Sequence, residues 1–257
     1  MTTRRVEHVM GMPVTLALRG RHTTDALADA VWVRVMESLR EADRLFSTYR
    51  EDSDVSRINR GELSLDAASP LVREVLGLGA EAALASNGAF DVWRSDVRGG
   101  TTLDPSGVVK GWAVDRAADL LDELEGTDFC LSAGGDMVCR TVVPGADPWR
   151  IGLEDPHDPQ RLLGLVPIAN GAVATSGTTH RGQHLVDART GRPPAGIASV
   201  TVITASLTWA DIDATAAYAR GSEAGAWLQS RPDRTALVVW ADGTTTTVRT
   251  APELGAA

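Results

Sequence analysis

Residues 235–249 read TALVVWADGTTTTVR, and this stretch indicates the fold class more directly than any other. Two short runs rich in β-branched residues, 235–240 and 244–249, flank the dipeptide Asp242-Gly243. Asp-Gly between two such runs is typical of a tight hairpin turn, because the central residues of that turn take positive φ. The stretch therefore predicts two neighbouring antiparallel strands late in the chain.

Other short apolar or alternating runs, each bounded by turn residues, predict further strands. These runs cover 129–132, 149–153, 163–168, 172–175, 184–187 and 199–204, and a first strand is expected over 9–18. Apolar periodicity and capping residues predict helices from Thr24 or Asp25 to about Phe46, and over 70–86, 112–124, 209–220 and 222–229. Early helices and late hairpins without regular strand–helix alternation favour an α+β fold, with mostly antiparallel sheets flanked by helices. At this length, 1–257 fits a single domain or two closely merged subdomains.

The composition is that of an acidic globular protein. Hydrophobic residues make up 43% of the chain and charged residues 23%, and the net charge is −9. A general nucleic-acid binder usually carries a basic face, so we expect no nucleic-acid partner. We also expect no membrane span, because no stretch approaches the roughly 20 apolar residues that one needs. Residues 1–19 do not resemble a signal peptide, because Glu7, His8 and Pro13 interrupt the apolar run, and they contain no lipid-accepting cysteine. We therefore expect a cytoplasmic protein.

Lys110 is the only lysine among 25 basic residues. It lies in residues 103–112, LDPSGVVKGW, where a turn is predicted to lead into a helix. Gly107 and Gly111 would let backbone groups approach a ligand closely, and a helix N-terminus attracts phosphate. Lys110 could therefore neutralise phosphate charge, although an ordinary glycine-containing loop with one surviving lysine explains the same residues.

Asp211 and Thr215 lie four positions apart in a predicted helix. At that spacing both side chains project from the same face. A carboxylate and a hydroxyl are hard oxygen ligands that suit Mg²⁺, which keeps other positions for water and substrate phosphate. The alternative is that Asp211 stabilises the helix dipole from the first turn.

Two further segments carry polar residues of functional type. The first contains Thr175-Ser176-Gly177 followed by His184 and Asp187, but it lacks the Gly-x-Ser-x-Gly elbow of a hydrolase. A histidine there could be a general base, and a structural histidine is the commoner case. The second, residues 132–136, places a Gly-Gly turn and Asp136 directly after a strand, which predicts a ligand-facing turn.

Taken in order, these segments resemble the ApbE-type FAD:protein FMN transferase family over nearly the whole chain. The similar segments are Met10–Pro13, Leu45–Asn59 (family FSTY), Gly88–Asp91 (GAFD), Asp104–Asp115 (DLGGIAKGYAVD), Ala133–Asp136 (AGGD), Thr175–Gly177 with His184–Gly191 (TSG and HIIDPRTG) and Asp211–Thr215 (DALAT). Seven ordered motifs are far more specific than any one of them. The resemblance implies an ApbE-like (T-fold-like) architecture.

The resemblance also implies a role for particular residues. FAD would contact Met10, Tyr49, Ala89, Phe90, Asp91, Asp104, Lys110 and Leu185. Mg²⁺ would be held by the side chains of Asp211 and Thr215 and by a backbone oxygen of Gly107. His184 falls where the family has a histidine implicated in activity, and Asp211 and Asp136 are the alternatives for the general base.

The function that follows is Mg²⁺-dependent transfer of the FMN moiety of FAD to a Ser or Thr hydroxyl of an acceptor protein, with release of AMP. One alternative is a Mg²⁺-dependent FAD pyrophosphatase, in which water replaces the protein hydroxyl. Another is a carrier that binds FAD without reaction.

The chain departs from the family pattern at several positions. Pro105, Ser106 and Val109 replace the usual Leu, Gly and Ala, and Asp91-Val92-Trp93 replaces Asp-Pro-Thr. Asp213 adds a carboxylate near the expected metal, which makes it either a further ligand or a solvent-facing residue. These departures bear on affinity and acceptor preference more than on the class of reaction.

Overall fold

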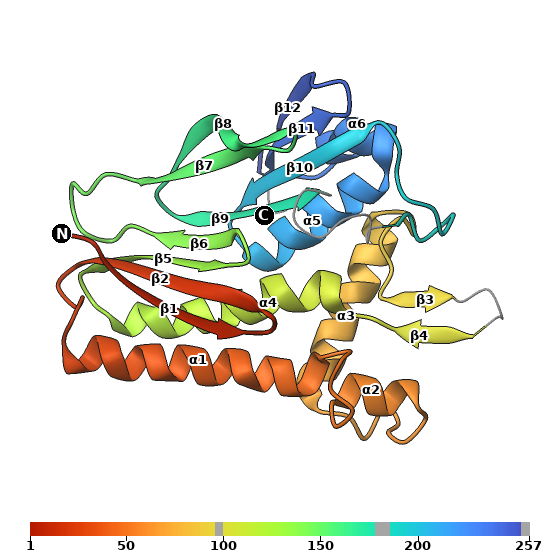
Figure 1. The fold of residues 1–257 in the computed structure, drawn as a ribbon, viewed down its shortest axis with the longest axis horizontal. Coiled ribbons are helices and arrows are strands. Elements are labelled where there is room, and N and C mark those ends of the chain that lie inside the picture. The colour runs from red at the N-terminus through yellow and green to blue at the C-terminus, as the bar shows by residue number, and fades with distance from the viewer. Residues whose placement is uncertain (96–99, 178–185, 253–257) are drawn as a thin grey trace, which may run out of the picture.

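The structure is a computed structural model that describes residues 1–95, 100–177 and 186–252. Its frame is an eight-stranded antiparallel sheet with the strand order β1-β2-β5-β6-β9-β10-β11-β12 (Figure 1). The strands are β1 Thr3–Val9, β2 Met12–Gly20, β5 Thr127–Ala133, β6 Asp136–Arg140, β9 Gly171–Gly177, β10 Ile197–Thr204, β11 Thr235–Trp240 and β12 Thr245–Arg249. Two separate ribbons pair β3 Trp93–Ser95 with β4 Thr101–Leu103, and β7 Trp149–Asp155 with β8 Asp158–Ile168.

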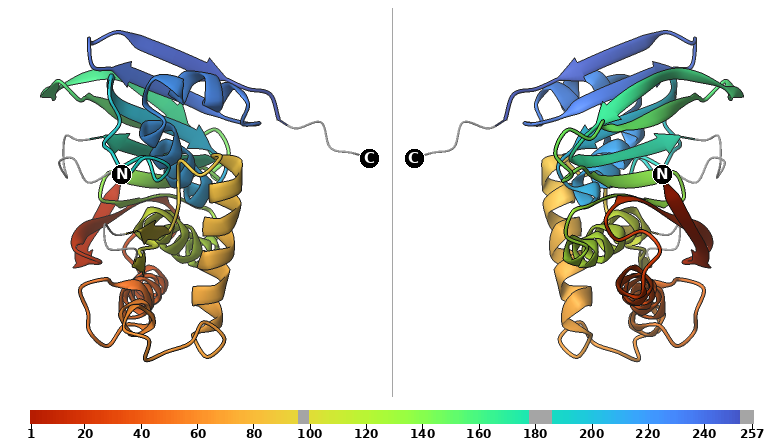
Figure 2. Two further views of the ribbon diagram at one scale, coloured as in Figure 1. Left: turned by 90° about the vertical axis from the view of Figure 1, so that its right-hand side faces the viewer. Right: turned by 90° about the vertical axis from the view of Figure 1, so that its left-hand side faces the viewer.

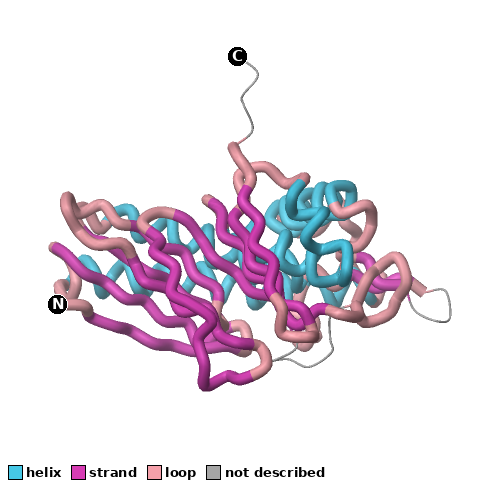
Figure 3. Tube along the Cα trace, turned by 90° about the horizontal axis from the view of Figure 1, so that it is seen from above, coloured by secondary structure: helices cyan, strands magenta, loops and turns pink. Residues whose placement is uncertain are grey.

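The helices gather on one face of this sheet, as the view from above shows (Figure 3). They are α1 Ala26–Phe46, α2 Asp54–Asn59, α3 Pro70–Ala85, α4 Ser106–Asp119, α5 Leu207–Ala219 and α6 Ala224–Gln229, with short 3₁₀ turns at Leu120–Glu123 and Gly221–Glu223. α3 runs crosswise to α1 (Figure 2). Local signals fix the helix starts, because Asp25 caps α1 and Ser69 caps α3 ahead of Pro70.

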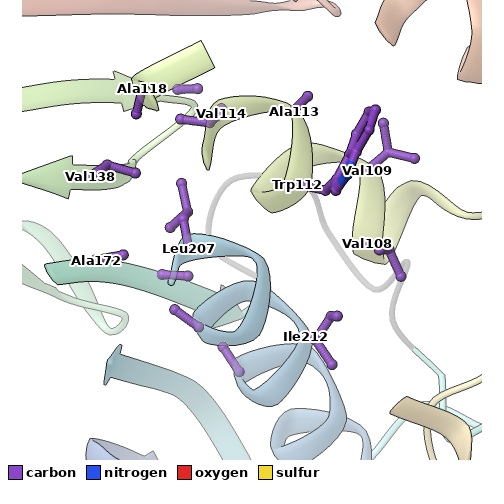
Figure 4. Close-up of a cluster of buried hydrophobic side chains, with 14 of the residues drawn as sticks. Val108, Val109, Trp112, Ala113, Val114, Ala118, Val138, Ala172, Leu207 and Ile212 are labelled. Atoms are coloured by element: carbon purple, nitrogen blue, oxygen red, sulfur yellow. The ribbon is translucent and has the colours of Figure 1, made fainter. Parts of the chain in front are cut away.

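Alternating side chains of the central strands enter two different cores. Leu131 of β5 and Ala172 of β9 belong to the main core beneath the helices, whereas Cys130 and Val173 belong to a smaller cluster under the β7–β8 ribbon. The sheet is thus covered on both faces there, by helices on one side and by the ribbon on the other. In the main core, Val108 and Trp112 of α4 and Leu207 of α5 belong to one cluster of buried apolar side chains (Figure 4), in which the Trp112 ring packs against Phe46 of α1.

The α+β prediction is confirmed, and so is the late hairpin. Gly243 has φ +84° in the turn, and Asp242 accepts a hydrogen bond from the Thr244 N–H at 2.9 Å. None of the helices within the described residues is long and apolar enough to cross a bilayer.

Three predicted elements differ from the structure. The single strand expected over 9–18 is wrong, because Met10 and Gly11 turn with φ 55° and 70° and join two strands as a hairpin. The helix expected over 112–124 begins at Ser106 instead, and Gly111 lies inside it as a contact residue rather than before its start. Of the strand expected over 184–187, residues 184 and 185 lie outside the described residues, and Asp187 forms only an isolated bridge with Arg192.

Candidate functional site

A cavity of about 840 Å³ lies where α4, α5, the β5–β6 turn and β9 meet. Its lining also includes parts of the β7–β8 ribbon, of β3 and of the segment before β3. Among the residues that line it are Ala89, Phe90, Asp91, Asp104, Gly107, Lys110, Asp136, Ser176, Asp211 and Thr215. The cavity therefore collects residues from segments far apart in the chain, including most of those that the sequence singles out.

Lys110 lies between two buried carboxylates at the base of this cluster. Its Nζ is 3.2 Å from Asp211 Oδ1 and forms an ion pair with Asp136 Oδ2. The other oxygens are held by backbone groups: the Thr175 N–H donates to Asp136 at 3.0 Å, and the Gly111 N–H donates to Asp211 at 3.1 Å. Both acids are thereby fixed in place, with one oxygen each directed toward the same ammonium group.

Burial sets the protonation behaviour of Asp211. Desolvation raises the pKa of this carboxyl from 3.8 to about 6, the ammonium of Lys110 opposes the rise, and the neighbouring Asp136 carboxylate adds to it. At neutral pH the carboxylate form predominates, so Asp211 presents a negative charge in a place largely shielded from water. A cation nearby is therefore strongly favoured.

The donor set around Asp211 suits a magnesium ion. Thr215 lies one turn further along α5, and its hydroxyl is 3.1 Å from the hydroxyl of Ser176. Gly107 adjoins them, because a Cβ built there would lie 3.8 Å from Thr215 Cγ2 and only 2.8 Å from the Phe90 ring. No three His, Cys, Asp or Glu side chains gather as a metal site within the described ranges. A carboxylate, hydroxyls and a backbone carbonyl fit Mg²⁺ that takes its remaining ligands from water and phosphate.

Two features lock α5 against α4 and thereby position Asp211. The carboxylate of Asp115 accepts hydrogen bonds from the N–H groups of Leu207 and Thr208 and from the hydroxyls of Ser206 and Thr208, at 2.7 to 2.9 Å. Gly111 lets the helices touch, since a Cβ there would lie 2.6 Å from the Leu207 carbonyl oxygen. Asp115, the last residue of the Asp104–Asp115 motif, thus anchors the first turn of α5, the helix that carries Asp211 and Thr215.

Asp213 is buried, so the expectation that it faces solvent is wrong, and its carboxylate is engaged elsewhere than at Asp211. Its buried carboxylate accepts hydrogen bonds from Arg231 Nε at 3.1 Å and Arg234 Nε at 2.6 Å. It does not line the cavity. Two residues beyond Asp211, a helical side chain points to a different side of α5, and here it joins that helix to the segment before β11.

The residues expected to contact FAD divide into three groups. Ala89, Phe90, Asp91, Asp104 and Lys110 line the cavity. Met10 packs against the main core, and Tyr49 is 97% exposed; neither belongs to the lining. His184 and Leu185 lie outside the described residues.

Some residues of the site lack a role in the sequence-based assignment. Ser176 adds a hydroxyl beside Thr215, and Trp93 and Arg94 line the cavity, with Arg94 paired to Asp104 at 3.0 Å. Ser176 lies in the Thr175–Gly177 motif, which is the signal that could have identified it. Trp93 falls at a departure from the family pattern and Arg94 directly follows it, and their residue types alone do not indicate a ligand site.

Comparison with known proteins places these observations in a family context. The family model described as "ApbE family" matches residues 10–97 and 93–239. A FAD:protein FMN transferase of Vibrio cholerae serotype O1 is 29% identical over 245 residues, covering 73% of this chain and 72% of that protein. A FAD:protein FMN transferase of Klebsiella pneumoniae is 33% identical over 151 residues, covering 54% of this chain and 46% of that protein.

Solved structures show the same fold. The ApbE protein of Thermotoga maritima has a TM-score of 0.83 and 21% identity, covering 97% of each chain. The flavinyl transferase ApbE of Pseudomonas stutzeri has a TM-score of 0.83 and 23% identity, covering 97% of this chain and 95% of that one. These likenesses confirm the expected ApbE-like architecture.

Proposed function

We propose the function of this chain from one premise: it belongs to the ApbE family. On that premise the chain is a transferase that cleaves FAD and moves its FMN moiety to an acceptor flavoprotein, with release of AMP. The acceptor group is a Ser or Thr hydroxyl, and the reaction depends on Mg²⁺.

The observation that carries this proposal is the convergence of Asp211, Thr215, Gly107 and Lys110 on one cavity. These residues combine hard oxygen donors with an ammonium group, which is the set needed to hold a divalent cation and the diphosphate of a dinucleotide together. The volume of the cavity, about 840 Å³, also falls within the range typical of small-molecule and cofactor sites.

In this proposal Asp211 and Thr215 hold Mg²⁺ with the backbone oxygen of Gly107. When bound, Mg²⁺ neutralises charge on the diphosphate and polarises the phosphorus under attack. The Gly111 N–H keeps the carboxylate of Asp211 in position from 3.1 Å, and Asp115 keeps the first turn of α5 in position. Lys110 and the N-terminal end of α4 favour the negative charge of the phosphates. Phe90 lines the same cavity, and its ring lies beside Gly107.

The nucleophile needs a base to accept its proton. His184 is the first candidate, since histidine titrates near neutrality. Asp211 and Asp136 are the alternatives within the cavity, and both carboxylates form ion pairs with Lys110.

The proposal is tested by incubating the purified chain with FAD, MgCl₂ and an acceptor protein that carries a Ser/Thr flavinylation motif. We expect a covalent fluorescent band on the acceptor and one AMP for each flavin transferred. Asp211→Asn should remove both products, because it takes the charge from the metal ligand without changing its size. Asp242→Asn, the same chemical change in the exposed β11–β12 turn, should leave both unchanged.

The same assay separates the alternative activities. AMP and free FMN without a labelled band would identify a pyrophosphatase and contradict the transferase proposal. Bound FAD with neither AMP nor a labelled band, across several acceptors, would identify a carrier.

A further inference from the structure

Within the cavity, two buried acids, Asp136 and Asp211, pair with the same flexible base, Lys110. Asp136 and Asp211 are buried, and each has one oxygen tied to a backbone N–H, from Thr175 and Gly111 respectively. The remaining oxygen of each acid faces Lys110, whose side chain is largely buried as well. Because both carboxylates are fixed, the long side chain of Lys110 is the part of this cluster that can move.

A divalent cation at Asp211 would compete with Lys110 for the same oxygen. The ammonium group lies 3.2 Å from Asp211 Oδ1, so a cation bound to that oxygen would be within a few ångströms of it. Like charges at such a separation repel strongly in a site shielded from water. Asp136 offers the ammonium group a second carboxylate partner, with which it already forms an ion pair.

We infer that Lys110 is an internal counter-ion that occupies the cation position at Asp211 and withdraws onto Asp136 when a divalent cation binds. This inference rests on the proposed function, because it takes Asp211 to be a metal ligand. It assigns Asp136 a positioning role. Once the Asp211 carboxylate coordinates the metal, Asp136 retains the ammonium group inside the cavity, beside the incoming diphosphate.

The choice of lysine in an otherwise arginine-only chain fits this role. An ammonium group is a compact point charge on a flexible stem, and it can move from two acids to one by rotation about single bonds. The planar fork of a guanidinium binds in a fixed geometry and is larger, so it would compete with the cation less reversibly. Of 25 basic residues, only position 110 carries the group that can make this exchange.

The uniqueness of Lys110 makes the exchange directly observable. Growth on ¹³C-labelled lysine gives the full-length protein a single Hε–Cε signal. We expect MgCl₂ to move this signal, both alone at high concentration and at lower concentration with FAD, while NaCl of equal ionic strength leaves it in place. Mg²⁺ binding is followed in parallel through the rise in Tm, which does not depend on the lysine.

A second measurement uses Lys110→Met, which removes the charge and keeps the length. Without the competing ammonium group, the affinity for Mg²⁺ in the absence of FAD should rise at least about tenfold. The metal-free variant should also have a lower Tm than wild type, because Asp136 and Asp211 lose their counter-ion. Arg231→Met is the matched control: it takes one cation from the buried Asp213 on the same helix, so it should lower Tm and leave Mg²⁺ affinity unchanged.

The outcomes separate this inference from the proposed function. If Mg²⁺ raises Tm and the Lys110 signal does not move, or if Lys110→Met binds Mg²⁺ no more tightly than wild type, the counter-ion role is wrong and the metal role stands. If Mg²⁺ changes neither Tm nor the signal even with FAD present, the metal role is wrong and this inference falls with it.

Discussion

Gly111→Ala should destabilise the protein although alanine is the better helix former. Gly111 lies inside α4, where helix propensity alone predicts that alanine would stabilise by about 0.5–1 kcal/mol. A Cβ at this position, however, would lie 2.6 Å from the Leu207 carbonyl oxygen and 3.0 Å from Thr208 Cα, both backbone atoms of α5. Ordinary contact begins at 3.4 Å, so α5 would have to retreat by about 0.8 Å.

Overpacking of this kind costs about 1–3 kcal/mol, which outweighs the propensity gain. The retreat also moves Asp211, whose own Cβ lies 3.0 Å from the added methyl group. We therefore expect urea denaturation to show a net loss of about 1–2 kcal/mol in unfolding free energy. The Mg²⁺-dependent rise in Tm should shrink at the same time.

Gly77→Ala is the matched control for this substitution. Gly77 lies inside α3, and a Cβ there would meet nothing within 4 Å. Alanine should therefore stabilise the protein by about 0.5–1 kcal/mol. If Gly111→Ala stabilised the protein as much as Gly77→Ala, close contact between α4 and α5 at Gly111 would be refuted.

Three further predictions concern the acids near α4 and α5. In the metal-free protein the raised pKa of Asp211 means that its protonated form favours the folded state; this contribution is fully present below pH 3.8 and is lost as pH rises through about 6. The unfolding free energy of wild type minus that of Asp211→Asn should therefore fall across this range, and a flat difference would contradict the raised pKa. Asp115→Ala should cost about 3 kcal/mol and weaken Mg²⁺ binding, because α5 loses its anchor; unchanged Mg²⁺ affinity would argue against that role. Asp213→Asn should lower the unfolding free energy by about 3–5 kcal/mol, because it breaks buried ion pairs. Calorimetric titration of the folded variant should show unchanged Mg²⁺ affinity, and a loss of affinity would identify Asp213 as a metal ligand.

Local signals explain what the sequence predicts well. The β11–β12 hairpin depends on Asp242-Gly243 and the two runs beside it, and the start of α3 depends on Ser69-Pro70. In both cases a few neighbouring residues are enough to predict the element. The four-residue spacing of Asp211 and Thr215 likewise puts both on the cavity side of one helix.

Contacts between distant segments explain what the sequence does not predict. Gly111 reads as a helix start, yet it is a contact residue whose partner Asp211 is 100 positions away. The pairing of Lys110 with Asp136 likewise depends on how α4 packs against the β5–β6 turn. The burial of Asp213 cannot be predicted from its neighbours in sequence either, because its ion-pair partners Arg231 and Arg234 lie 18 and 21 positions away.

The sequence does not predict the β1–β2 hairpin, for a local reason. Met10-Gly11 lacks the Asn-Gly or Asp-Gly signature, and the apolar run from Val9 to Leu18 continues through it. β1 is also an edge strand, and its charged residues, such as Arg4 and Glu7, hide the alternation that would mark a strand.

The central claim is that Asp211 and Thr215 hold a divalent cation against the diphosphate of FAD. Crystals grown with FAD and MnCl₂ test it most directly, because Mn²⁺ takes the same oxygen ligands as Mg²⁺ and gives an anomalous signal. We predict one strong anomalous peak about 2.1 Å from oxygens of Asp211 and Thr215, in contact with the flavin-side phosphate. A bound FAD whose diphosphate lies away from α4 and α5, with the Mn²⁺ peak elsewhere, would contradict the claim.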